Sequence, residues 1–199
     1  MNFKDYRTVF IASSLVLMLI AASPTLGLII QFPSNAERFS ELWVLGPDHS
    51  AKNYPFNVRV NESNSVFVGV NNHLGALSYY LIYVKFRNQT QPLPNATASE
   101  PSLLPPIFEF RAFVKDNEAW EAHVTFIISD VSLHNDSMSV NRMIINGKTL
   151  AFNSFAKFDA ERNGFYYELL FELWLYDQGS RILTFNRRFV GIWLNVTAS

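Results

Sequence analysis

The strongest constraint on this chain is the alternation of apolar and polar side chains that runs through most of it after residue 33. In Ser78–Phe86, the apolar residues Tyr80, Ile82, Val84 and Phe86 recur at every second position. Successive side chains of a β-strand point to opposite faces of a sheet, so this repeat indicates a half-buried strand. Similar alternation, rich in β-branched and aromatic residues, recurs at 57–60, 65–70, 119–129 and 189–196. The sequence therefore predicts an all-β fold.

Two segments fit either a helix or a strand. Ser34-Asn-Ala-Glu37 has the form of a helix capping box, yet the residues that follow it, Phe39–Leu45, alternate as a strand does. In Tyr166–Tyr176, a helix would place Glu168 and Glu172 on one face. A strand would instead gather a wholly apolar row, Tyr167, Leu169, Phe171, Leu173 and Leu175. We interpret both segments as strands.

Turn signals separate these strands. Asn146-Gly147 indicates a two-residue hairpin, because both residues tolerate the positive φ that such a turn requires. Asp177-Gln178-Gly179 and Asn163-Gly164 mark further turns. The five prolines of Gln91–Pro106 indicate a loop between sheet halves, since proline cannot donate to a sheet. About eight strands at this spacing predict an immunoglobulin-like antiparallel β-sandwich.

The N-terminal region has a different pattern, because Thr8–Ile30 contains no charged residue across 23 positions. As a helix, this run would extend roughly 35 Å, enough for a hydrocarbon core of about 30 Å. Lys4 and Arg7 precede it, and basic residues collect on the cytoplasmic side of a membrane. We therefore expect a single-pass cell-membrane protein. It would have a cytoplasmic N-terminus over 1–7, a transmembrane anchor in the lipid bilayer over 8–32, and an extracytoplasmic β-sandwich domain over 33–199.

A cleaved signal peptide is the rival interpretation, because Ala21-Ala22-Ser23 is a run of small residues. Cleavage after Ser23 would leave Pro24 as the first residue, and the apolar run is longer than the about 7–15 residues of a usual signal core. Both features favour an uncleaved anchor, which Pro24 would kink. A buried core helix fits less well, because the run is not amphipathic.

The composition excludes several classes of function. The 16 basic and 17 acidic residues give a net charge of −1, which provides no basic surface for nucleic acid. The absence of cysteine excludes disulfides, thiol nucleophiles and cysteine-ligated metals. Charged residues make up 17% of the chain, against about 25% in average soluble domains, which favours a membrane protein or an uncharged surface.

Five Asn-x-Ser/Thr sequons occur, and none has proline at its middle position. Four of the asparagines fall in expected turns or loops outside the membrane, and we take these as candidate glycosylation sites: Asn61, Asn88, Asn95 and Asn135. Asn88 and Asn95 flank the proline-rich loop and are the strongest candidates. Asn195 lies on a terminal strand and is the weakest.

No pattern in the sequence nominates a catalytic, cofactor or metal site. The histidines lack the spacing of metal ligands and are expected in turns or on the surface: His49, His73, His123 and His134. The face that carries Glu168 and Glu172 is expected to be solvated or to pair with Arg187 or Arg188. P-loop, G-x-G-x-x-G and G-x-S-x-G motifs are absent. We therefore expect a protein that is not an enzyme and has no cofactor or metal.

Outward aromatic side chains are the most suggestive surface feature. Tyr79 and Tyr83 fall on the outer face of one expected strand, and Trp174 and Tyr176 fall on the outer face of another. Such rings can cover a second layer, contact the membrane interface, or bind a protein or a glycan. Leu103–Ile107 is a second candidate contact strip. These aromatic residues form our candidate interaction surface.

Several longer motifs resemble a known family. They are Glu37–Pro47, Asn53-Tyr-Pro55, Val66–His73, Tyr79–Val84 and, less closely, Arg188–Leu194. Together they resemble the archaeal membrane-protein family catalogued as domain of unknown function 1616. The resemblance implies an archaeal cell-surface domain held by transmembrane segments, with no assigned activity. Members often carry several N-terminal membrane helices, so this chain, with one expected helix, resembles a short version.

Three hypotheses follow for the function. The leading one is a non-catalytic accessory subunit or envelope interaction module, glycosylated and with a membrane or envelope protein as partner. The alternative is a carbohydrate-binding or glycan-processing surface domain that stacks sugars on Tyr79, Tyr83 and Trp174 and needs carboxylates beside them. The third is a metal-dependent surface enzyme that uses His73 or His123.

Overall fold

The structure is a computed structural model that describes residues 6–18 and 37–198. The chain divides into two units, 1–38 and 39–199. Residues 6–18 form a helix. Within the described residues, no helix combines the length and the apolar character that a membrane crossing requires. The part of the expected anchor after residue 18 lies outside the described residues, as do residues 34–36 of the alternative capping box.

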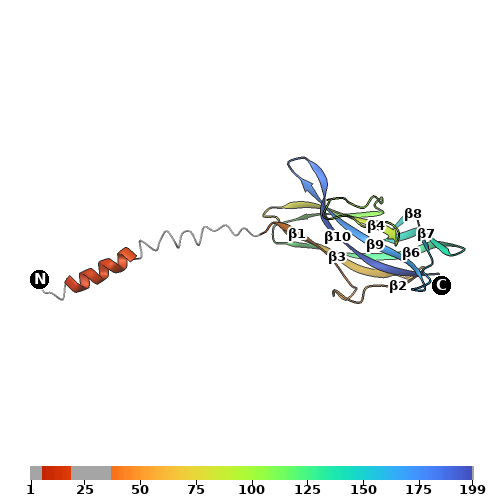
Figure 1. Cartoon of the computed structure of the whole chain (residues 1–199), viewed down its shortest axis with the longest axis horizontal. Helices are drawn as coiled ribbons and strands as arrows, with labels where there is room; N and C mark the ends of the chain where they lie inside the picture. The colour runs from red at the N-terminus through yellow and green to blue at the C-terminus, as the bar shows by residue number, and fades with distance from the viewer. Residues whose placement is uncertain (1–5, 19–36, 199) are drawn as a thin grey trace. The chain divides into compact units, whose positions relative to one another are not determined.

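The second unit is a sandwich of two five-stranded sheets (Figure 1). The first sheet contains, in spatial order, β1 (Phe39–Leu45), β3 (Asn64–His73), β6 (Ala119–His134), β7 (Ser137–Ile145) and β8 (Lys148–Lys157). The second sheet contains β2 (Asn57–Arg59), β10 (Ile182–Thr197), β9 (Phe165–Asp177), β4 (Ser78–Asn88) and β5 (Phe108–Val114). The expected all-β sandwich is confirmed, and both ambiguous segments are strands.

The core lies between the two sheets and is built from the alternating apolar rows. In β4, Tyr80, Ile82, Val84 and Phe86 are buried, as expected from their spacing. The apolar row of β9 lies beside them on the same face of the sheet, because β4 and β9 are antiparallel neighbours in register. Its members Tyr167, Leu169, Phe171 and Leu173 are fully buried, and Leu175 packs against them. Burial of these large side chains is the main contribution to the stability of the domain.

One strand pairing departs from the expected antiparallel sandwich, because β2 runs parallel to β10. The chain reaches β2 from β1 in the other sheet, through residues 46–56. Parallel neighbours cannot be joined by a tight hairpin, and β2 and β10 are connected by the whole of residues 60–181. The parallel contact is short and involves Asn57–Arg59 against Asn195–Thr197.

The turns lie where the sequence predicts them. Asn146 and Gly147 have φ values of 48° and 77° and join β7 to β8. Asp177 ends β9, and its carboxylate accepts hydrogen bonds from the backbone of Gly179 and Ser180. The β9–β10 hairpin that follows projects beyond the sheets (Figure 1). The proline-rich segment is a loop, but it joins β4 to β5, which are neighbours in one sheet.

Candidate functional site

Two buried ion pairs lie on the outer face of the second sheet. Lys85 Nζ is 2.8 Å from Glu172 Oε2, and the two side chains are 4% and 0% exposed. Arg87 pairs with Glu168 further along the same two strands. The antiparallel register between β4 and β9 places Arg87 opposite Glu168 and brings Lys85 within reach of Glu172. The outer face of this sheet is therefore covered at its centre.

The cover is the proline-rich loop between β4 and β5. Ser102 accepts a hydrogen bond from Lys85 Nζ at its carbonyl, 2.6 Å away, and donates its amide to Glu172 Oε1 at 2.9 Å. Arg87 donates to the carbonyls of Asn88 and Gln91. Buried charges are tolerated when each is paired and its remaining hydrogen bonds are made, and the loop backbone makes them here. The charge of each carboxylate is therefore balanced by a cation, and both carboxylates are shielded from solvent.

The expectation for Glu168 and Glu172 was thus wrong. They are neither solvated nor paired with Arg187 or Arg188, because the loop excludes water and β4 supplies the cations. A bulge between Phe185 and Arg188 changes the β10 register, and Arg188 Nε donates to the carbonyl of Ser40 at 3.3 Å. The sequence shows the alternation of these strands but not which strands are neighbours.

The Arg87 guanidinium also supports an aromatic ring. Its central carbon lies 5.1 Å from the centroid of Trp193, a cation–π contact, and 36% of Trp193 is exposed. Two adjoining hollows of about 280 Å³ and 500 Å³ share Trp193 and Phe56. We call them the Trp193 hollow. Besides Trp193 and Phe56, the side chains that line it are Val44, Tyr54, Gln89, Arg162, Tyr166, Val190 and Ile192.

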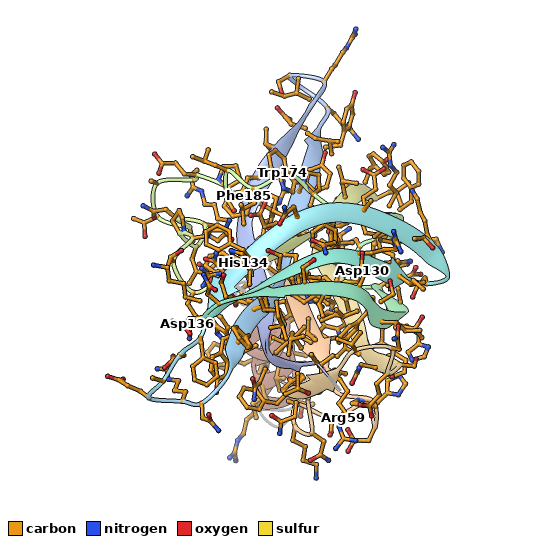
Figure 2. All side chains as sticks on the ribbon, turned by 90° about the vertical axis from the view of Figure 1, so that its right-hand side faces the viewer. Arg59, Asp130, His134, Asp136, Trp174 and Phe185 are labelled. Carbon is orange, nitrogen blue, oxygen red and sulfur yellow. The ribbon has the colours of Figure 1, made fainter. Side chains whose placement is uncertain are left out.

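The four aromatic residues of the candidate interaction surface do lie together. Tyr83 contacts Trp174 edge to face, with ring centroids 5.4 Å apart, and Tyr79 lies 6.3 Å from Tyr176. Trp174 also lies 6.0 Å from Phe185, where the β9–β10 hairpin leaves the sheet (Figure 2). Trp174 Nε1 donates to Glu172 Oε2 at 3.4 Å, so this ring is tied to the buried ion pair. Tyr83 and Trp174 are half-buried, whereas Tyr176 is exposed.

Sequence reasoning missed several exposed residues around this surface. Phe113 stacks on Tyr79 at 4.7 Å and is 71% exposed, but it lies in β5, which we had not identified as a strand. Leu77 and Tyr176 line a hollow of about 400 Å³ beside it. The outward position of Trp193 was implied by the alternation within 189–196, and only the fold reveals the hollow at its side.

The histidines contact aromatic rings and turns. His49 and His123 both stack on the ring of Phe67, with centroid distances of 3.5 Å and 4.7 Å, and His49 Nε2 lies 3.0 Å from Glu121 Oε1. His73 Nδ1 lies 3.1 Å from the side chain of Asn117 in a turn. Among residues 6–18 and 37–198, no group of three or more His, Asp or Glu side chains is placed to hold a metal ion.

The candidate glycosylation sites differ in accessibility. Asn61, Asn95 and Asn135 are exposed, and Asn61 and Asn135 lie in turns with φ values of 66° and 51°. Asn88 is only 4% exposed, and its side-chain nitrogen, which a glycan would occupy, donates to the carbonyl of Phe155 at 2.6 Å. The folded structure therefore disfavours Asn88, which the sequence had ranked first with Asn95. Glycosylation at the other three positions stays a prediction.

Comparison with solved structures gives only distant likeness. A β-glucosidase from Listeria innocua in complex with gluconolactone aligns at 10% identity and a TM-score of 0.38, covering 80% of this chain but only 16% of that one. The CARDB domain of a Pyrococcus furiosus protein, in complex with di-metal ions, aligns at 11% identity and a TM-score of 0.39. The alignment covers 81% of this chain and 96% of that one. A chain of the human complex of Zinc 2-glycoprotein with Prolactin inducible protein aligns at 11% identity and a TM-score of 0.39. The alignment covers 82% of this chain and 99% of that one. Likeness at this level carries no argument about ligand or activity.

Sequence comparison is more informative. No curated protein matches the chain. The sequence profile described as "Domain of unknown function (DUF1616)" matches residues 33–140, slightly more than half of the chain. This match covers the Glu37–Pro47, Val66–His73 and Tyr79–Val84 motifs that carried the resemblance. The chain therefore belongs to the DUF1616 family.

Proposed function

We propose that this chain is a non-catalytic interaction module, anchored to the cell membrane by its N-terminal segment, that displays its β-sandwich outside the cell. The observation that carries the proposal is the aromatic surface formed by Tyr79, Phe113 and Tyr176, in which the half-buried Tyr79 ring contacts the exposed rings of Phe113 and Tyr176. Contiguous exposed apolar surface of this kind is typical of interaction sites.

The buried charges support a non-catalytic role. General acid–base catalysis needs a carboxyl group that can exchange protons with a substrate. The carboxylates of Glu168 and Glu172, at the centre of the outer face, are each buried in an ion pair. The loop backbone occupies the space above Glu172. These residues therefore hold the loop on the sheet.

Crosslinking in native membranes tests the proposal. The full chain would be crosslinked, gently solubilised and purified, and the material that co-purifies would be identified by mass spectrometry. We expect an envelope component in stoichiometric amount, lost in Phe113→Ser and retained in Leu133→Ser, a matched change at a residue of similar exposure elsewhere. Recovery of the chain alone, or equal loss in both variants, would refute the binding of a protein partner by this surface.

The Trp193 hollow supports a second candidate, saccharide binding. Its exposed rings Tyr54, Phe56 and Trp193 offer flat apolar faces, and Gln89 and Arg162 offer hydrogen-bond donors beside them. The lining contains no carboxylate, so the hollow suits binding but not glycan processing. Calorimetry with cellohexaose and with oligogalacturonate tests this candidate. Binding that is lost in Trp193→Ala but kept in Trp174→Ala would support it, and no heat with either probe would dismiss it.

A further inference from the structure

The domain has two unlike ends. The register of the strands brings seven strand termini to one end of the sandwich. They are the starts of β1, β4, β6 and β10 and the ends of β3, β5 and β9. We call this the proximal end, because the chain enters the domain there at Phe39. The β9–β10 hairpin projects at this end (Figure 1). The C-terminus lies at the distal end (Figure 1).

Four exposed apolar side chains lie at the proximal end. Leu77 is 54% exposed, Phe113 71%, Tyr176 37% and Ile182 57%. They come from the β3–β4 turn, β5, β9 and the start of β10. We call these four residues the proximal patch. Leu77, Phe113 and Tyr176 line the same hollow, so this part of the patch is contiguous.

Two exposed arginines at this end can bind an anionic partner. Arg181 and Arg187 are exposed in and after the β9–β10 hairpin, and neither forms an ion pair within the described part of the chain. The acidic groups at this end have other partners, and Glu118 pairs with Lys115. Asp177 accepts from Gly179 and Ser180, and Asp116 accepts from the amide of Gly75. Neither arginine pairs with one of these carboxylates, so both can contact an external anion.

The candidate glycosylation sites give an independent indication. Asn61 lies in the β2–β3 turn and Asn135 in the β6–β7 turn, both at the distal end. The proximal turns, 74–77, 115–118 and 178–181, contain no sequon. A surface held against a bilayer has no room for a glycan, so this distribution fits a domain whose proximal end is covered.

We propose that the proximal patch rests on the surface of the bilayer that holds the N-terminal segment. The aromatic and aliphatic side chains would lie at the level of the headgroups, where Tyr and other amphipathic rings are enriched. Arg181 and Arg187 would lie next to anionic lipid phosphates. This inference rests on the membrane anchorage proposed above and names the partner of the aromatic surface. A protein partner at the same patch is the competing outcome.

Site-specific fluorescence tests the proposal, and the absence of cysteine makes each introduced label unique. The full chain would be reconstituted into vesicles of phosphatidylcholine and phosphatidylglycerol that contain a spin-labelled lipid. A fluorophore would be attached at Phe113→Cys, at Ile182→Cys as a second proximal position, and at Leu133→Cys as the distal control. We expect quenching several-fold stronger at both proximal positions than at Leu133, which is 56% exposed. Circular dichroism would establish that each labelled variant is folded.

The arginines provide a second test. Arg181→Glu with Arg187→Glu should reduce quenching at Phe113→Cys, as should omission of phosphatidylglycerol. Arg59→Glu, an exposed position at the distal end, should leave quenching unchanged.

Three outcomes distinguish the proposals. A chain that floats with vesicles but is quenched equally at all positions would refute the lipid contact and leave anchorage intact. A chain that does not float with vesicles would refute anchorage and the lipid contact together. A Phe113 photo-crosslink to a protein in native membranes, without lipid quenching, would replace the bilayer with a protein partner.

Discussion

Each buried charge in this fold depends on its partner. Lys85→Met would leave Glu172 buried without a countercharge, and loss of one member of a buried pair costs about 3–5 kcal/mol. We therefore expect a large fall in the free energy of unfolding, measured by urea titration. The double variant Lys85→Met, Glu172→Leu should recover most of the loss, because neither charge then remains.

An exposed ion pair is the control for this prediction. Lys115 lies 3.2 Å from Glu118, but both side chains are mostly exposed. Lys115→Met should leave the urea midpoint unchanged, because solvent screens such pairs. Equal effects of Lys85→Met and Lys115→Met would contradict the burial of the Lys85–Glu172 pair.

Gly191 leaves the space that Glu168 occupies. A Cβ atom at position 191 would overlap the Glu168 carboxylate and push it away from Arg87. Gly191→Ala should therefore destabilise the domain by about 1–3 kcal/mol, the usual cost of overpacking, as seen in thermal unfolding. Gly179→Ala is the matched control, because its Cβ would meet only Asp177 at ordinary contact distances. A stable Gly191→Ala would show that the Glu168–Arg87 pair can move.

Burial of Tyr167 contributes to the pH dependence of stability at alkaline pH. Loss of solvation raises the pKa of Tyr167, whose hydroxyl donates to the carbonyl of Met138. A pKa raised in the folded state gives stability that is complete below the unfolded pKa of about 10 and is lost as the pH rises through the folded value. The free energy of unfolding should thus fall above about pH 10. Urea titrations across this range should show a shallower fall for Tyr167→Phe than for the natural chain.

At the scale of elements, the proline-rich loop is part of the sheet's outer layer. The Ser102 amide donates to the buried Glu172 carboxylate, so it should exchange its hydrogen as slowly as strand amides do. The amide of Leu103, whose side chain is 94% exposed, should exchange fast. Hydrogen-exchange NMR would measure both, and Glu172→Gln should raise the Ser102 rate selectively. Equal, fast exchange at both positions in the natural chain would mean that the loop is open.

For β3, β4, β6, β9 and β10, the alternation of side chains was sufficient to predict which face is buried, because that repeat follows from local backbone geometry. It correctly assigned Phe39–Leu45 and the apolar row of Tyr166–Tyr176. It did not predict the burial of Glu168 and Glu172. Polar residues on the outer face of a sheet are expected to be solvated unless a covering loop is known. The parallel β2–β10 contact was also unpredictable, because its partners are far apart in the sequence. Asn57 and Asn195, which pair in it, are separated by 138 positions.

At the scale of the whole molecule, the matched family region is not a structural unit. Residues 33–140 include β1–β6 and the start of β7, but not β9 or β10, which lie between β2 and β4 in the second sheet. Without them the core loses Tyr167, Phe171 and Leu194, and β4 loses a neighbour. We therefore expect the fragment 33–140 to lack a cooperative urea transition and dispersed amide NMR signals, and the fragment 39–199 to show both. A cooperative, equally stable fragment 33–140 would mean that the first six strands form a fold of their own, with β7–β10 added to it.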